Sequence, residues 1–317
     1  MKKLCLLVLM LTMTAVFMSC SKKKEAELNF NAGEASYDKG EYEIAVAEYS
    51  KAIELDPEYS KAYNSRGVAY SALKNYLEAI NDYSRAIELD SLYVWPYSNR
   101  GSAFTQIRDY ERAALDLDKA IKLDSTIAEP YYNRGNLNIV TSRFSAAVTD
   151  YSKAIEINPG YAEAYNSRGN IYFNQNEFAK AVTDYTKVIE LQPENPKAYY
   201  DRGFSYYYIK GYDEMIADFS KAIELDPSNG DSYKNRGLAY YEKKMYEEAI
   251  GDFSKSIEIK PEMATSYSNR ARAYYSIKKY KESAADFNEY LRLAGNTFKN
   301  ADQVRKFIKE MGYQPKY

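Results

Sequence analysis

The strongest constraint in this sequence is a pattern that recurs every 34 residues over most of the chain. A recurrence of this length predicts a row of similar structural repeats, in place of the two domains that 317 residues would otherwise suggest. We number the positions of each repeat 1 to 34. Repeats one to eight begin at Ala26, Ser60, Val94, Ala128, Ala162, Pro196, Gly230 and Ala264.

The spacing of apolar residues within a repeat predicts two helices. Positions 4, 7, 8 and 11 fall on one helical stripe, and positions 17, 20, 24, 27 and 28 fall on a second. Each repeat is therefore expected to form two amphipathic helices joined by a turn. Because a pair of helices about 12 residues long buries too little surface to be stable alone, the repeats must stack on one another.

Glycine at position 8 and aromatic residues at position 17 are expected to mark the core. Glycine occupies position 8 in seven repeats, where it costs about 1 kcal/mol relative to alanine. We therefore expect the partner helix to approach closely there, with a small residue at position 20, such as Ala79 or Ala181, opposite the glycine. Position 17 is aromatic in all eight repeats, so most of the 35 tyrosines are expected to lie in the core.

One pair of charged positions varies together along the chain. Position 7 is arginine and position 23 is aspartate in repeats two to eight, whereas repeat one has Ala32 and Glu48 there. This pattern predicts an ion pair that holds the two helices of a repeat together, with the bidentate geometry that arginine allows. The alternative is that the arginines anchor a ligand.

The complete pattern resembles a known family. Repeat five has Tyr165 at position 4, Gly169 at 8 and Tyr172 at 11, followed by Ala181 at 20, Tyr185 at 24 and Pro193 at 32. These identities at this spacing resemble the tetratricopeptide repeat, and the resemblance covers residues 26–297. It implies an all-α fold, a right-handed superhelical α-solenoid of eight helix pairs. It also implies a concave groove lined by positions 2, 5, 6, 9, 12 and 13 of the first helices.

The two ends of the array are expected to differ from its middle, because each end exposes a face that an inner repeat buries. In repeat one, Asn29, Ala32 and Ser36 stand where most other repeats have tyrosine, arginine and an aromatic residue. After repeat eight, Val304, Phe307, Ile308 and Met311 follow an i, i+3, i+4, i+7 spacing. Residues 298–317 are therefore expected to form a C-terminal capping helix and tail.

Two sets of residues on the groove positions are candidates for ligand binding. Asparagine recurs at position 6, where its amide can hydrogen-bond an extended peptide backbone; the alternative is an inherited consensus residue. An apolar set departs from the usual polar lining and predicts an interaction surface, with packing between repeats as the alternative. The candidate groove residues are Asn99, Asn133, Asn235, Asn269, Trp95, Tyr200, Phe204, Tyr207, Tyr208, Leu238 and Tyr241.

The N-terminus has the features of a secretion signal. Lys2 and Lys3 precede an apolar run over residues 4–18, so residues 1–19 are expected to be a signal peptide. The run is short for a membrane-spanning helix. The sequence ending at Cys20 resembles the lipobox of bacterial lipoproteins, which implies lipidation of Cys20; an uncleaved anchor or an ordinary signal peptide are the alternatives. Residues 20–25 would then be the lipidated N-terminus and a tether, whose lysines could contact anionic lipid or be a solvated linker.

Composition excludes several classes of function. The chain has no histidine, and its only cysteines are Cys5 and Cys20, so the repeats lack the commonest general base and metal ligands. The 43 basic and 45 acidic residues nearly balance, which disfavours nucleic-acid binding. We therefore expect no enzymatic activity, no cofactor and no metal.

The expected function is a protein- or peptide-binding scaffold or adaptor in the bacterial cell envelope, on the periplasmic or outer-membrane side. It would be secreted across the inner membrane and anchored there by its lipid. The alternatives are a glycan- or peptidoglycan-binding module and a structural solenoid that assembles with copies of itself.

Overall fold

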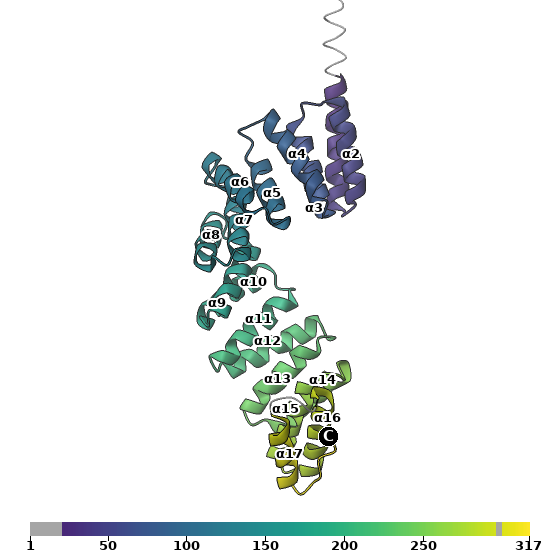
Figure 1. Ribbon diagram of the computed structural model, residues 1–317, viewed down its shortest axis with the longest axis vertical. Coiled ribbons are helices and arrows are strands. Elements are labelled where there is room, and N and C mark those ends of the chain that lie inside the picture. The colour runs from purple at the N-terminus through teal and green to yellow at the C-terminus, as the bar shows by residue number, and fades with distance from the viewer. Residues whose placement is uncertain (1–20, 296–299) are drawn as a thin grey trace, which may run out of the picture. The chain divides into compact units, whose positions relative to one another are not determined.

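The computed structural model describes residues 21–295 and 300–317, and all regular elements over these residues are helices (Figure 1). The chain divides into two compact units, residues 1–159 and 160–317, which are described separately below. The predicted signal peptide and the lipidation site at Cys20 lie outside the described residues. Within each unit, consecutive helices pack on one another in pairs, so the expectation of an all-α repeat solenoid is confirmed.

The first compact unit contains repeats one to four. Its first helix covers residues 21–38 and therefore includes residues predicted to be a tether. Lysine, glutamate and alanine are good helix formers, and no glycine or proline separates them from repeat one. The helices that follow are α2 (Tyr42–Leu55), α3 (Ser60–Ala72), α4 (Tyr76–Leu89), α5 (Val94–Gln106), α6 (Tyr110–Leu123), α7 (Ala128–Val140) and α8 (Phe144–Ile157).

The second compact unit contains repeats five to eight and one further helix. From α9 to α16, the first helix of each pair begins at position 1 of its repeat and the second begins at position 17. The helices are α9 (Ala162–Asn174), α10 (Phe178–Leu191), α11 (Pro196–Tyr208), α12 (Tyr212–Leu225), α13 (Gly230–Glu242), α14 (Tyr246–Ile259), α15 (Ala264–Ser276), α16 (Tyr280–Ala294) and α17 (Ala301–Glu310).

A left-handed residue at position 15 ends the first helix of a repeat. In repeat seven, Lys244 has a φ of 63° and its N–H donates to the Tyr241 carbonyl at 2.9 Å. The next N–H, of Met245, donates to the Tyr240 carbonyl at 2.9 Å. These two bonds satisfy carbonyls at the end of α13 and reverse the chain into α14. Glycine fills this position only in repeat one, at Gly40.

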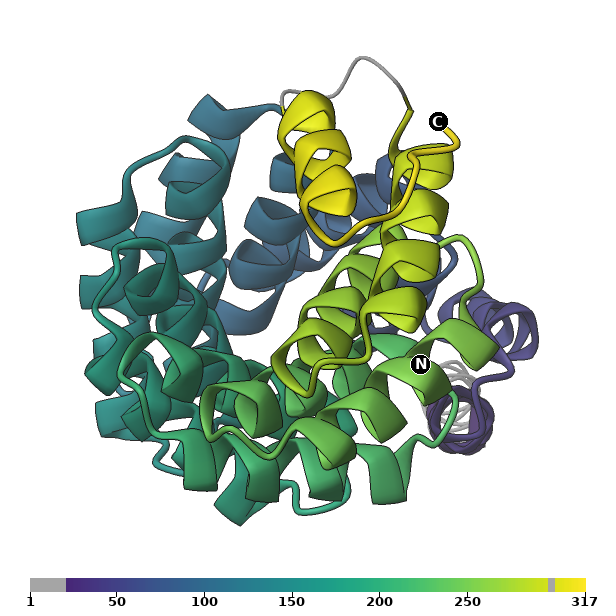
Figure 2. The ribbon, with the colours of Figure 1, turned by 90° about the horizontal axis from the view of Figure 1, so that it is seen from below.

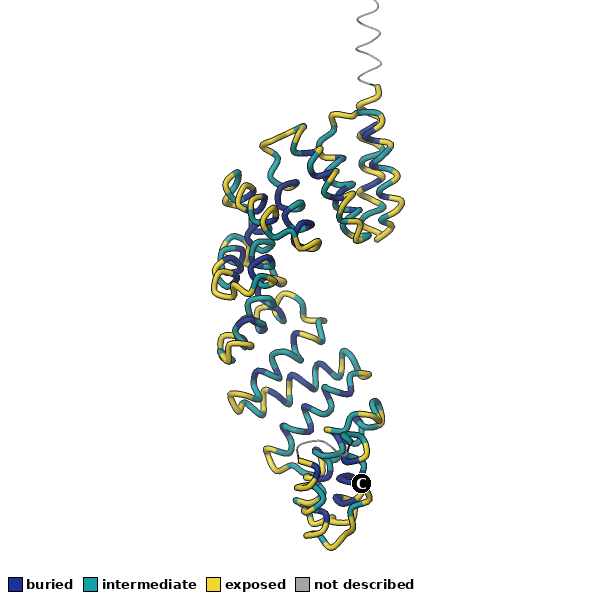
Figure 3. Tube along the Cα trace, in the orientation of Figure 1, coloured by how far each residue is buried: buried dark blue, intermediate teal, exposed yellow. Residues whose placement is uncertain are grey.

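The core of each repeat is centred on position 24, and buried residues line the faces along which neighbouring helices meet (Figure 3). The rings of Tyr49, Tyr83 and Phe253 at this position are at most 1% exposed. A Cβ placed on Gly237 would come within 2.8 Å of Phe253, so glycine at position 8 makes room for that ring. The expectation of close approach was right, but its partner is mainly the large residue at position 24, with the small residue at position 20 secondary.

The aromatic residues at position 17 lie at the edge of the core, contrary to the expectation from sequence. None is buried, and Phe144 is 46% exposed. Position 17 is the first residue of the second helix, beside the turn, and in repeats one, five, seven and eight its ring contacts the ring at position 12 of the same repeat. Two examples are Tyr241 with Tyr246, at 5.5 Å between centroids, and Tyr275 with Tyr280, at 5.4 Å.

The predicted arginine–aspartate pair is confirmed in repeats two to eight. In repeat seven, Arg236 donates from Nε and Nη2 to the two carboxylate oxygens of Asp252, both at 2.8 Å. Its Nη1 donates to the Ser220 hydroxyl of the preceding repeat at 3.0 Å. We call this arrangement the clamp; it ties the two helices of one repeat to each other and to the repeat before. In the other repeats, the aspartate at position 23 pairs in the same way with the arginine at position 7, which is Arg66, Arg100, Arg134, Arg168, Arg202 or Arg270.

Helix α17 covers the last repeat. It lies beside α15 and α16 (Figure 2), and its Ala301 and Ile308 are buried against Phe287 and Leu291 of α16. The Phe307 ring contacts Phe287 at 5.6 Å between centroids. The apolar face that α16 would otherwise expose is thereby removed from water, which is the role of a capping helix.

Candidate functional site

Three of the candidate asparagines join neighbouring repeats. Nδ2 of Asn99 donates to Asn64 Oδ1, Nδ2 of Asn133 donates to the Ser98 hydroxyl, and both distances are 3.0 Å. Each bond runs from position 6 of one repeat to position 5 of the repeat before it. These amides therefore stabilise the stacking of repeats within the first compact unit. This role favours the alternative that asparagine at position 6 is a consensus residue of the repeat.

Asn235 is corrected from a groove residue to a buried one. It is 2% exposed, and its Nδ2 donates to the Tyr200 hydroxyl at 3.0 Å. The bulky tyrosine at position 5 covers it, so its amide has no surface to offer a ligand. Asn269, the fourth candidate asparagine, is partly buried on α15.

An aromatic surface does form around α11, and it includes two residues of repeat five that were not among the candidates. Phe204 stacks on Phe173 of α9 at 5.6 Å, and Tyr208 stacks on Phe178 of α10 at 4.3 Å with an interplanar angle of 7°. Tyr207 lies 5.4 Å from Tyr208. We call these five residues the α11 aromatic cluster. Phe178 was missed because position 17 was assigned to the core. Phe173 was not selected, although it is a phenylalanine at position 12, one of the groove positions.

Within the α11 aromatic cluster, Tyr208 is the ring most available to a partner. It is 46% exposed, whereas Phe204, Phe173 and Tyr207 are partly buried. Tyr200, one turn before Phe204 on the same helix, packs edge-on against Phe219 at 5.3 Å and is also partly buried. The structure thus brings together four of the predicted residues, Tyr200, Phe204, Tyr207 and Tyr208, on one helix.

The other predicted apolar residues are apart from the α11 aromatic cluster or belong to the packing. Leu238 is partly buried between repeats six and seven, where it contacts both hydrophobic cores. The guanidinium of Arg272 lies over the Tyr241 ring, 5.0 Å from the ring centroid. Trp95, which is 38% exposed, lies on α5 in the first compact unit.

A polar cavity of about 560 Å³ lies at the N-terminal end of α11. Burial raises the pKa of Asp201 in its wall, although Lys197 pairs with it and opposes that shift. Burial would also raise the pKa of Asp231, but hydrogen bonds from Lys234 and Lys260 outweigh it and hold that pKa below its usual value. The charges of Asp201 and Asp231 are therefore already paired, and the cavity offers hydrogen-bonding groups beside the Tyr200 ring.

A metal site needs several ligating side chains close together in space. Among the described residues, no group of three acidic, cysteine or histidine side chains lies close enough to hold a metal ion. No helix over residues 21–295 and 300–317 is both long enough and apolar enough to cross a bilayer. The geometry defines an all-α repeat solenoid whose most distinctive surface is the aromatic one on α11.

Comparison with protein families identifies the repeats. The family described as "TPR repeat" matches residues 33–74, 142–176, 169–210 and 205–244. Two families described as "Tetratricopeptide repeat" match residues 60–91 and 230–263, and residues 96–127 and 264–297. The chain is therefore a tetratricopeptide-repeat protein. Among curated proteins there is no match.

Solved structures with the same fold include three whose own length is almost wholly covered. YrrB, "a TPR protein with an unusual peptide-binding site", is 26% identical, with a TM-score of 0.54 over 58% of this chain and 95% of YrrB. MamA is 24% identical, with a TM-score of 0.52 over 53% of this chain and 92% of MamA. The C-terminal part of a TPR repeat-containing protein from Cytophaga hutchinsonii is 21% identical, with a TM-score of 0.63 over 75% and 97%.

Proposed function

We propose that this protein is a lipid-anchored scaffold of the bacterial cell envelope that binds a protein or peptide segment along α11. The observation that carries the proposal is the α11 aromatic cluster, in which rings from α9, α10 and α11 form one continuous apolar surface. Exposed apolar surfaces of this kind usually mark an interaction site. The fold is shared with YrrB, a TPR protein with an unusual peptide-binding site.

The class of ligand follows from the side chains that surround the cluster. Rings of Tyr207 and Tyr208 offer flat apolar contact with few rotatable bonds to immobilise, which suits the apolar side chains of an extended peptide. The cavity beside Tyr200 supplies carboxylate and amino groups for the peptide backbone. These groups support the proposed role in binding a peptide.

The envelope location is supported by the N-terminal sequence. The positive start, the apolar run over residues 4–18 and Cys20 fit a lipoprotein signal. Replacing Cys20 by serine should abolish incorporation of a labelled fatty acid and move the protein from the membrane to the soluble fraction. Lipid labelling that is unchanged in Cys20→Ser would refute the anchor, and it would leave the groove proposal standing.

Site-specific photo-crosslinking in native cells tests the groove. A photoreactive phenylalanine analogue is placed at Tyr208 in one variant and at Phe144 in another, because the two side chains are equally exposed, at 46% each. We expect a discrete crosslinked partner from Tyr208 only. The same partner should be lost from Tyr208 crosslinking when Tyr207 is changed to alanine, in a protein of unchanged melting temperature.

Other outcomes favour the two alternatives. Equal crosslinking from Tyr208 and Phe144, or none from Tyr208, would remove the α11 surface as the binding site. Sedimentation of the protein with purified peptidoglycan would then favour a glycan-binding module. A mass that rises with concentration, and falls when α17 is deleted, would favour self-assembly.

A further inference from the structure

Repeat four differs from the other clamped repeats at a position that touches the clamp. Position 11 is aromatic in repeats two, three and five to eight, but it is Asn138 in repeat four. The partner that the clamp arginine contacts in the preceding repeat also differs. Arg134 contacts Asp118, whereas five other clamp arginines contact a serine or threonine at this position. Both changes fall around Arg134.

In five other repeats, those of Arg66, Arg100, Arg168, Arg236 and Arg270, the clamp guanidinium lies against two aromatic rings. Arg236 lies 5.7 Å from the Tyr233 centroid and 5.9 Å from that of Tyr240. The corresponding distances are 5.7 and 5.8 Å for Arg168, and 5.8 and 5.9 Å for Arg270. One ring comes from position 4 and the other from position 11. In repeat four, the ring of Tyr131 at position 4 lies 5.7 Å from Arg134, but position 11 supplies no ring.

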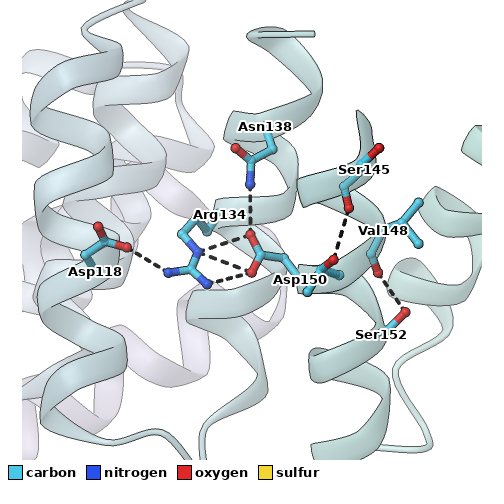
Figure 4. A network of polar contacts seen from close by, with 8 residues as sticks. Asp118, Arg134, Asn138, Ser145, Val148, Asp150 and Ser152 are labelled. Carbon is cyan, nitrogen blue, oxygen red and sulfur yellow. Dashed lines mark hydrogen bonds and ion pairs between the residues drawn. The ribbon is translucent and has the colours of Figure 1, made fainter. Parts of the chain in front are cut away.

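Asn138 does not refill the space that the missing ring leaves. Its side chain turns to the clamp, where Nδ2 donates to Asp150 Oδ2 at 2.8 Å (Figure 4). A pocket of about 390 Å³ that is broadly open to solvent lies beside it. The Arg134 side chain is 29% exposed, whereas the other clamp arginines are 17–20% exposed.

The walls of this pocket combine apolar and charged groups. Ala114 and Ala146 supply apolar contact, and Arg134 and Arg143 are present together with Asp118 and Asp150. Two positive and two negative charges balance, so the lining favours a neutral ligand. The Asp118 side chain is 51% exposed and accepts one bond from Arg134 at 2.7 Å, which leaves carboxylate lone pairs for a further donor.

We propose that this pocket binds a neutral aromatic ring that carries a hydrogen-bond donor, such as the phenol of tyrosine. The ring would take the place of the missing position 11 side chain against Arg134, and its hydroxyl would donate to Asp118. The space is sufficient, since a cavity of about 150 Å³ holds benzene. Cation–π contact supplies part of the attraction. The site is in the first compact unit and shares no residue with the α11 aromatic cluster, so it is independent of the proposed function.

Three small probes test this proposal on the whole protein: p-cresol, toluene and N-acetyl-tyrosinamide. Binding is measured by chemical-shift changes at the α7 amides. We expect saturable binding of p-cresol, with toluene weaker by about tenfold because it has no hydrogen-bond donor. Binding of N-acetyl-tyrosinamide as well would indicate a tyrosine side chain of a partner. Binding of p-cresol without it would indicate a free aromatic molecule.

Two variants and a control make the result specific. Asn138→Tyr restores the residue of most other repeats, so it should raise the melting temperature and abolish p-cresol binding. Val140→Tyr places the same ring at an exposed site on α7 that does not line the pocket, and it should leave binding unchanged. Asp118→Ser leaves the pocket open and should remove the preference for p-cresol over toluene.

The proposal is overturned by any of three results. These are no saturable p-cresol binding by the wild-type protein, equal binding by wild-type and Asn138→Tyr protein, or a preference for p-cresol that survives in Asp118→Ser. If Asn138→Tyr fails to fold, the comparison of p-cresol with toluene in Asp118→Ser still decides the question.

Discussion

Replacing Arg236 by methionine should destabilise repeat seven strongly, because it leaves the carboxylate of Asp252 buried without its partner. Asp252 is 7% exposed, and the pair is joined by two charge-assisted hydrogen bonds of 2.8 Å. Bonds to charged groups contribute about 1.5–3 kcal/mol each, and breaking a buried pair costs about 3–5 kcal/mol. Since Arg236 is 19% exposed, water compensates in part and we take the lower value, about 3 kcal/mol.

The measurement is urea and thermal unfolding together with hydrogen exchange. A loss of this size lowers the melting temperature by about 6–12 °C for a unit of this length. Because repeat arrays open locally, exchange should accelerate most in α13 and α14. Lys255→Met, which breaks an exposed pair with Glu258 on the same α14, should leave both readouts unchanged.

The double variant Arg236→Met, Asp252→Leu separates the loss of a bond from the cost of an unpaired charge. It should recover part of the stability that Arg236→Met loses, since no buried carboxylate then lacks a partner. If Arg236→Met is no less stable than Lys255→Met, the clamp does not hold the two helices together and the reasoning fails.

Two further changes test the turn and the buried charge. Lys244→Gly should leave the free energy of unfolding unchanged or raise it by up to about 1 kcal/mol. Glycine adopts the positive φ of this position without strain, but it loses more chain entropy on folding, which offsets part of the gain. Glu242→Gly, two residues earlier in α13, should lower the free energy of unfolding by about 1 kcal/mol instead. If Lys244→Gly were the more destabilising of the two variants, the turn geometry would be contradicted. Burial raises the pKa of Glu129, so its charged form weakens the fold above that pKa, and the penalty vanishes as pH falls below the usual value of 4.5. Glu129→Gln should therefore raise the melting temperature at about pH 8 and match wild type at about pH 4, and an equal gain at both values would exclude the charge as the cause.

The binding surface was only partly predictable from sequence. Phe204 and Tyr208 could be placed on the groove positions because a helix has a fixed period. Asn235 was misassigned, since its burial depends on the size of Tyr200 one repeat earlier. The contribution of Phe178 was also hidden, because whether a ring at the start of a helix lies in the core depends on how the next repeat packs against it.

The sequence by itself determined the helices, their pairing and the arginine–aspartate pair within each clamp. A 34-residue period, a helical stripe and an arginine that varies together with an aspartate are all properties of residues close in the chain, and each repeat supplies them again. Only the tertiary structure decided which side chains meet between the two helices of a repeat and between neighbouring repeats. The ring at position 24 fills the space above the glycine, the asparagines bond across to position 5, and Asn138 leaves a pocket beside Arg134. These outcomes depend on side-chain volumes and directions at contacts between helices, which the order of residues along one helix does not specify.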